Sequence, residues 1–357
     1  LEISGEKMRD TILVNRGTCH ACVVACKREV AVAGTDITAE YGGPEYETIA
    51  ANGSLLGIGN LKHIAEANKR LAQYVLDSIS TGAAIAFAME CYEMGIITKE
   101  DAGGLELNWG DEAVALQLID MIARREGIGD VLAEGVKRAA EEYGDGADHY
   151  AMHVKGQELP MHEPRGKRSL ALAYATSATG ADHMEAPHDP FYESFDPQGF
   201  NALSSLGLLE PVDRLDMGPK KVKAYYYTQL VWTLYDTVGM CDFVGEPIND
   251  LMIDKLGEYV SAVTGWNMSV WEMLKVSERT NMLKRAFNIR EGFTPDDDTL
   301  PDRMFEPLES GALKGLAIDR DEFHDMCNLY YDMVGWDRQS GYPTKAKLME
   351  LDLEWLG

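Results

Sequence analysis

The chain has 357 residues, of which 45% are apolar, so it can bury a substantial core and form about two domains. Its 59 acidic and 33 basic residues give a formal net charge of −26, which argues against nucleic acid and anionic membrane surfaces as partners. The sequence shows no run of about 18 apolar residues and no signal peptide, so we expect a cytoplasmic protein without a membrane span.

The first half of the chain is predicted to be mainly helical. A short apolar run at residues 11–14 leads into a turn. Further along, Gly43-Pro44 excludes a helix around residues 43–44. Hydrophobic spacing and capping residues predict the helices that follow. They cover residues 61–75 with Asn60 as N-cap, residues 83–93, and residues 131–142 with Asp130 as N-cap.

A loop-rich passage around residues 145–168 predicts a boundary between two domains, residues 1–153 and 154–357. The polar loop at residues 292–301 carries Asp296-Asp297-Asp298, which we expect in solvent. Helices in this half are predicted at residues 169–177, 220–235, 270–285 with Ser269 as N-cap, and 345–355. Because strand-like alternation is scarce, the predicted fold class is mainly α, with two packed helical domains.

Three cysteines, Cys19, Cys22 and Cys26, fall within eight residues. Two and then three intervening residues let a short loop bind three corners of an iron–sulfur cube, which leaves one corner for a distant cysteine. Zinc is an alternative, although His20 lies directly beside Cys19, where both side chains could hardly reach one ion. A disulfide framework is a second alternative, but it is typical of small secreted domains.

The fourth ligand must come from the three remaining cysteines. Cys91 and Cys327 lie in apolar helical surroundings and are predicted to be core residues. Cys241 differs, because Gly239 ends a helix just before it and the carboxylate of Asp236 stands five residues upstream. We therefore predict Cys241 as the fourth ligand.

Cys19-x-x-Cys22-x-x-x-Cys26 together with Asp236-x-x-Gly239-Met240-Cys241 resembles the tungsten-dependent aldehyde ferredoxin oxidoreductase family. The resemblance extends over the whole chain, through residues 43–48, 76–82, 125–135, 163–166, 175–177, 180–183, 287–293 and 335–337. It implies a [4Fe-4S] cluster on the four cysteines, a tungsten or molybdenum bis-pyranopterin, and ferredoxin as the electron-transfer partner.

The resemblance also implies which residues contact the pterins. A carboxylate accepts the paired N–H donors of a pterin edge in two parallel bonds. The residues that match family positions for this role are Asp77, Ser78, Asp182, Asp236, Gly239 and Met240. The first of the two family motifs, at residues 72–77, departs from the pattern because it lacks the opening Asp and the Gly.

Glu47 and His183 match the family positions for proton transfer. A carboxylate in a closed apolar pocket can act as a base, and a histidine can donate a proton to the substrate oxygen. The alternatives are a Glu47 carboxylate bonded within its own turn and a His183 that is simply a satisfied buried residue. Residues 179–189 also depart from the Arg-bearing version common among aldehyde oxidisers, which leaves the substrate open.

Family members carry an additional sheet-rich domain at their amino end. The resemblance therefore predicts that this chain corresponds to most of the second and all of the third domain, and that the pterin centre needs the missing domain. The expected reaction is oxidation of an aldehyde to a carboxylic acid. A related aromatic acyl-CoA reductase of the benzoyl-CoA type, and a non-catalytic iron–sulfur module, are the alternatives. His63 and Glu66, three apart on one helical face, match either a metal half-site of a homodimer or a surface ion pair.

Overall fold

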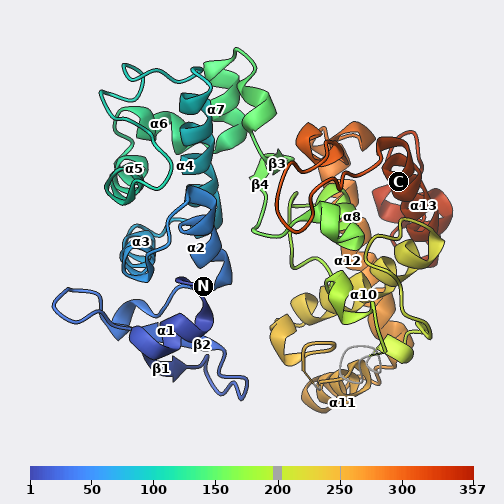
Figure 1. The fold of residues 1–357 in the computed structure, drawn as a ribbon. Helices are drawn as coiled ribbons and strands as arrows, with labels where there is room; N and C mark the ends of the chain where they lie inside the picture. Colours follow the sequence, from blue (N-terminus) through green and yellow to red (C-terminus); the bar gives the residue numbers. More distant parts are fainter. Residues whose placement is uncertain (196–202, 250) are drawn as a thin grey trace. The chain divides into compact units, whose positions relative to one another are not determined.

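The computed structural model describes residues 1–195, 203–249 and 251–357, which form two compact units, Leu1–His162 and Glu163–Gly357 (Figure 1). The predicted boundary after residue 153 falls inside strand β3 (His153–Val154), which pairs with β4 (Gln157–Glu158). This hairpin belongs to the first unit. The mainly α fold class is confirmed, because the described strands form only two small two-stranded sheets.

The first unit is built from helices and carries a small hairpin at one end. Its helices are α1 (Gly5–Thr11), α2 (Tyr46–Ala51), α3 (Leu61–Tyr74), α4 (Ser78–Glu93), α5 (Glu112–Arg124), α6 (Ile128–Leu132) and α7 (Val136–Tyr143). The hairpin strands β1 (Leu13–Gly17) and β2 (Lys27–Val30) are antiparallel, with Leu13 opposite Val30 and Gly17 opposite Lys27. In Figure 1 this hairpin and α1 lie at one end of the unit, and α5 to α7 lie at the other.

Helix α4 forms the centre of the first unit and is buried over most of its length. Its side chains are apolar or small around most of its circumference, as expected of a core helix. It contacts α2 closely, because a Cβ on Gly82 would lie 2.6 Å from the carbonyl oxygen of Ala51. Among the described residues, no single helix has both the length and the composition to cross a bilayer; α3 and α4 meet these criteria only together, across a bend of 115°.

Helix α3 confirms the predicted cap, because the Asn60 side chain accepts a hydrogen bond from the Lys62 amide at 3.0 Å. The predicted helix over residues 131–142 is wrong, because the chain forms α6 and α7 with a break at Gly135, where φ is +86°. The reason is a distant cap: Glu158 accepts a hydrogen bond from the Val136 amide at 2.8 Å. Asp130 lies inside α6 and starts no helix.

The second unit packs its helices around α10. Its helices include α8 (Arg168–Thr176), α10 (Pro219–Thr237), α11 (Ile253–Thr264), α12 (Val270–Arg290), α13 (Arg320–Val334) and α14 (Lys345–Glu350). Helix α10 contacts α8, α12 and α13, and it contributes the buried aromatic residues Tyr225, Trp232 and Tyr235. The predicted Ser269 cap of α12 is confirmed by its hydrogen bond from the Glu272 amide at 3.1 Å.

The expectation that the acidic triplet at residues 296–298 lies in solvent is wrong for Asp298. Its side chain is buried and pairs with the buried guanidinium of Arg285 at 2.7 Å. Arg285 also lies over the Trp336 ring, with 4.3 Å between the guanidinium carbon and the ring centroid. A partner distant in the sequence can neutralise a carboxylate and allow its burial, even where the local run of acidic residues predicts exposure to solvent.

Glu246 is fully buried beside α10, and its carboxyl group makes the free energy of unfolding depend on pH. One oxygen accepts a hydrogen bond from the Ile253 amide at 3.2 Å, whereas Oε2 has no partner. Burial raises the pKa of Glu246 to about 7. Because the folded pKa lies above the unfolded value, the contribution to stability is complete below the unfolded pKa and is lost as pH rises towards about 7.

Replacing Glu246 by glutamine is therefore expected to raise the free energy of unfolding at pH 8 by about 2–3 kcal/mol and to change it little at pH 4. Glutamine keeps the shape of the protonated acid but has no charge to bury. Denaturant unfolding followed by tryptophan fluorescence measures this, because five of the six tryptophans lie in the second unit. An unchanged difference between the two proteins across this pH range would contradict a titrating Glu246.

Candidate active site

The three clustered cysteines occupy the loop that joins β1 to β2 in the first unit. The pairing of Gly17 with Lys27 closes the loop at its base. Inside the loop, the Cys22 amide donates to the Cys19 carbonyl at 3.1 Å, and the Thr18 hydroxyl donates to the Cys22 carbonyl at 2.6 Å. The hairpin therefore holds a compact loop with all three thiols within it.

The backbone of this loop is strained at two places that precede cysteines. Ala21 has a φ of 55° and Ala25 a φ of 49°, in the left-handed region that residues with a Cβ rarely adopt. They stand directly before Cys22 and Cys26. Alternation of right- and left-handed residues turns successive backbone N–H groups to the same side, which suits an anionic centre. The loop thus fits a thiolate-bound cluster.

The arrangement of the thiols also bears on the alternatives. None of the six cysteines, all of which lie in described residues, forms a disulfide. Zinc bound by sulfur at about 2.3 Å would bring its ligand sulfurs to within roughly 4 Å of one another. Among the described residues, the three cysteines do not form a group whose ligand atoms all lie within 4.8 Å of one another. Zinc and an iron–sulfur cluster both stay alternatives for this loop.

Cys241 lies just beyond the carboxyl end of α10 in the second unit, and it is exposed. The helix ends at Thr237, and the turn that follows contains Gly239, whose φ of 74° lies in the left-handed region that favours glycine. The Met240 amide donates back to the Tyr235 carbonyl at 2.8 Å, and the Gly239 amide donates to the Asp236 carbonyl at 3.0 Å. This cap explains the spacing of the motif, because Asp236 lies in the last turn of the helix and Cys241 follows the glycine turn.

The other two cysteines are buried, as expected of core residues. Burial raises the pKa of Cys91 to about 12, which disfavours the thiolate that a metal requires. Cys241 belongs to the second unit and the other three candidate ligands to the first. Ligation of one cluster by all four stays a prediction.

Carboxylates gather near the end of α10, within the second unit. Burial, together with the charges of Asp236, Asp182 and Glu185, raises the pKa of Asp242 to about 8. Burial likewise raises the pKa of Asp236, which the nearby Lys284 opposes. The Asp242 oxygen Oδ1 is buried without a hydrogen-bond partner. Such a group favours a ligand that presents several N–H donors, and a pterin edge does so.

His183 lies in the loop after α8, and a neighbouring histidine holds its backbone. The Nε2 atom of His188 lies 2.8 Å from the His183 carbonyl, and Nδ1 of His188 lies 3.2 Å from the Lys167 ammonium. Because the Lys167 ammonium can only donate, Nδ1 of His188 accepts its hydrogen bond. Nε2 of His188 therefore carries the ring proton and donates to the His183 carbonyl. The two histidine rings are 6.2 Å apart. His188 therefore fixes the loop that carries His183.

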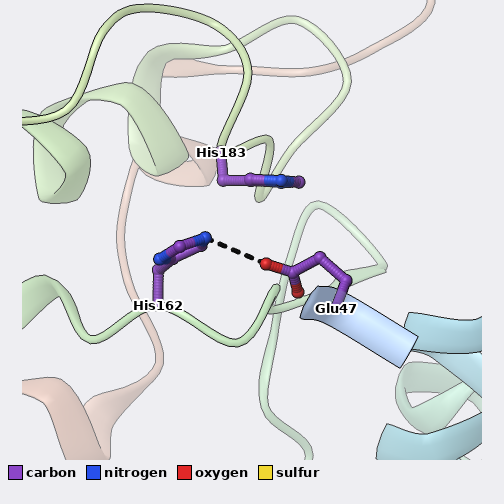
Figure 2. A group of neighbouring side chains, drawn as sticks. All are labelled: Glu47, His162 and His183. Carbon is purple, nitrogen blue, oxygen red and sulfur yellow. Dashed lines mark ion pairs between the residues drawn. The ribbon is translucent and has the colours of Figure 1, made fainter. Parts of the chain in front are cut away.

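Glu47 lies in the first turn of α2 and pairs with a residue that the sequence analysis missed. Its Oε1 atom lies 2.9 Å from Nε2 of His162, and its Oε2 atom accepts a hydrogen bond from the Met161 amide at 2.7 Å. Figure 2 shows the two side chains pointing towards one another, with the ion pair dashed. His183, the third residue labelled there, belongs to the second unit.

Tyr46 completes this arrangement in the first unit. Its ring stacks on the His162 ring with 5.1 Å between centroids, and its hydroxyl donates to the Met161 carbonyl at 2.8 Å. Residues 161 and 162 are thus fixed by α2 from both sides. The alternative in which Glu47 bonds within its own turn is not what the structure shows, because its partners lie more than 110 residues further along the chain.

The predicted pterin contact Asp77 caps α4, with its Oδ1 atom accepting from the Ser80 amide at 2.7 Å. Ser78 bonds to Thr48 of α2 at 2.9 Å between hydroxyl oxygens. Glu66 forms ion pairs with Lys69 and Arg70. His63 is buried, and neither of its ring nitrogens has a hydrogen-bond partner among the described residues, so His63 and Glu66 do not form a surface ion pair with each other.

A family model described as "Aldehyde ferredoxin oxidoreductase, domains 2 & 3" matches residues 1–353. The tungsten-containing aldehyde ferredoxin oxidoreductase of Pyrococcus abyssi is 36% identical over 358 aligned residues, covering 99% of this chain and 55% of the relative. The aliphatic sulfonate oxidoreductase, WOR-like subunit, of Pyrococcus furiosus is 33% identical, covering 87% of this chain and 46% of the relative.

Among solved structures, the active site complex BamBC of benzoyl coenzyme A reductase in complex with 1,5 dienoyl-CoA superposes with a TM-score of 0.76. The identity is 23%, and the match covers 99% of this chain and 55% of that chain. At this identity the likeness concerns the fold. The chain spans about half the length of the curated relatives that it matches.

Proposed function

Because the chain belongs to the aldehyde ferredoxin oxidoreductase family, we propose that it supplies the cluster loop and much of the pterin site of an enzyme that oxidises an aldehyde to a carboxylic acid. Electrons pass through a [4Fe-4S] cluster to ferredoxin in this proposal. The cysteine loop with left-handed Ala21 and Ala25 carries the proposal, because a folded protein retains such strain where a bound group or function requires it. The proposed activity is that of a whole enzyme, and the relatives named above are almost twice as long as this chain.

In this proposal the tungsten or molybdenum bis-pyranopterin supplies the two-electron redox chemistry when it is bound. The chain's own residues bind, orient and move protons. Asp236 and Asp182 accept hydrogen bonds from pterin N–H groups, and the turn at Gly239 and Met240 aims Asp236 and Cys241 to the same end of α10. Asp77 and Ser78, at the amino end of α4, contact the other pterin.

Glu47 takes the proton that leaves when water adds to the aldehyde carbon, and the imidazole of His162, with Nε2 at 2.9 Å from Oε1, positions the carboxylate. His183 donates a hydrogen bond to the substrate oxygen. The fixed position of its backbone, held through His188 and Lys167, keeps the ring oriented without movement during the reaction.

A second candidate function is a tungstopterin reductase of the benzoyl-CoA type. The departure at residues 179–189 leaves the substrate class open, and a solved structure of such a complex shares the fold. Both functions use the same cluster and pterin residues. They differ in substrate and in the direction of electron flow. A third candidate is a non-catalytic iron–sulfur module that binds no pterin.

The full-length protein tests these alternatives directly. We expect aldehyde oxidation coupled to reduction of a viologen dye, and no reduction of a benzoyl thioester. The Cys241→Ala variant should lose the four-iron cluster, seen as loss of iron and of the visible absorbance that dithionite bleaches, while Cys327→Ala keeps it. Thioester reduction without aldehyde oxidation would favour the second candidate. A full iron content without tungsten, molybdenum or turnover would favour the third.

A further inference from the structure

Two arginine side chains bind the carbonyl groups of the cysteine loop from its two flanking strands. Arg16 of β1 donates from Nη2 to the Ala25 carbonyl at 3.1 Å. Arg28 of β2 donates from Nη1 to the Cys26 carbonyl. Each contacted carbonyl belongs to the last turn of the loop, where Cys26 leaves for β2. The hairpin thus brings two positive charges to one loop.

These charges are only partly compensated. In the part of the chain that the structure describes, no ion pair to Arg16 is found. Arg28 has one, with the Glu45 carboxylate at 3.5 Å, and both side chains are about half exposed. The whole chain carries a net charge of −26, so this local positive charge opposes the general trend of the molecule. Its position at the backbone of the cysteine loop indicates an electrostatic role.

We propose that Arg16 and Arg28 set the reduction potential of the iron–sulfur cluster by stabilising its reduced form, an inference that rests on the cluster in the proposed function. Reduction adds one electron, and therefore one negative charge, to a group that the cysteine loop would hold, and both guanidinium groups bind this loop. A nearby cation favours the state with the more negative charge. Because Glu45 offsets Arg28, Arg16 has the larger effect of the two.

The test uses the 357-residue chain with the cluster reconstituted from iron and sulfide without oxygen. The cluster is reduced stepwise with dithionite, and the reduced form is measured by its electron paramagnetic resonance signal. At a fixed potential, Arg16→Met should lower the ratio of reduced to oxidised cluster about three- to tenfold, where tenfold corresponds to 59 mV for one electron. Arg28→Met should lower it less. The control is Arg9→Met, because Arg9 is an exposed residue of α1 that pairs with Asp10. This variant should leave the ratio of reduced to oxidised cluster unchanged.

Two further variants separate charge from loop structure. Arg16→Lys keeps the positive charge but not the planar guanidinium, so it should retain the wild-type potential if charge is responsible. Glu45→Gln removes the negative charge beside Arg28 and should raise the ratio, opposite in sign to Arg28→Met.

Equal potentials in all variants would overturn the inference while leaving the cluster, and the proposed function, intact. If Arg16→Lys, which keeps the positive charge, shifted the potential as much as Arg16→Met does, the arginines would act through loop folding alone. A wild-type chain that assembles no cluster would remove the proposed function and this inference together.

Discussion

Replacing Asp189 by asparagine is expected to lower the free energy of unfolding of the second unit by about 3–5 kcal/mol. Asp189 and Lys221 are both fully buried and form an ion pair. Asp189 also accepts hydrogen bonds from the Ser169 amide at 3.2 Å and the Ser169 hydroxyl at 2.5 Å. Asparagine keeps one acceptor oxygen for the Ser169 amide and can donate to the Ser169 hydroxyl, but it leaves the Lys221 ammonium without a counter-charge. An unpaired buried charge is costly.

Denaturant unfolding followed by tryptophan fluorescence measures this change at neutral pH. Asp325→Asn, on the exposed face of α13, is the matched control and should alter stability by no more than about 0.5 kcal/mol. Adding Lys221→Met to Asp189→Asn removes both charges and should restore part of the stability. If Asp189→Asn alone were as stable as the wild type, the pair would not stabilise the fold in the manner described.

Replacing Glu47 by glutamine in the full-length protein is expected to lower kcat on the order of 10²–10⁴-fold with little change in KM. Glutamine can still accept the hydrogen bond that the Met161 amide donates, so the local structure should persist. It cannot accept a proton. The loss therefore reports the acid–base role in the proposed reaction and not the shape of the side chain.

Viologen reduction with an aldehyde substrate measures both constants. Glu40→Gln, an exposed carboxylate seven residues earlier, should leave them unchanged. Circular dichroism and iron content should match the wild type in both variants. A Glu47→Gln protein with normal turnover would assign Glu47 to a structural role, in which it holds residues 161 and 162 against α2.

Elements with local signals were predictable from the sequence. Asn60 and Ser269 both cap helices where expected, because a capping side chain bonds to an amide two or three residues away. The break between α6 and α7 was not predictable, because Glu158, which caps α7, lies 22 residues further along. The burial of Asp298 has the same origin, since its partner Arg285 lies on another element.

The candidate site shows the same division. The cysteine loop could be recognised because its chemistry lies within eight residues, and the turn at Gly239 because a glycine marks a left-handed position. His162 gave no signal, because its pairing with Glu47 depends on contacts between distant segments of the first unit. Left-handed conformations at Ala21 and Ala25 were equally hidden, since alanine does not favour them.

The close approach of α4 to α2 has a consequence for how mutations in this protein are interpreted. A Cβ at position 82 would displace Ala51 and with it the short helix that begins beside Glu47. A variant at Gly82 could then abolish turnover although this glycine meets neither substrate nor cofactor. In a scan scored by activity alone, position 82 would be mistaken for part of the reaction centre, and only a measurement of folding would reveal it as a spacer.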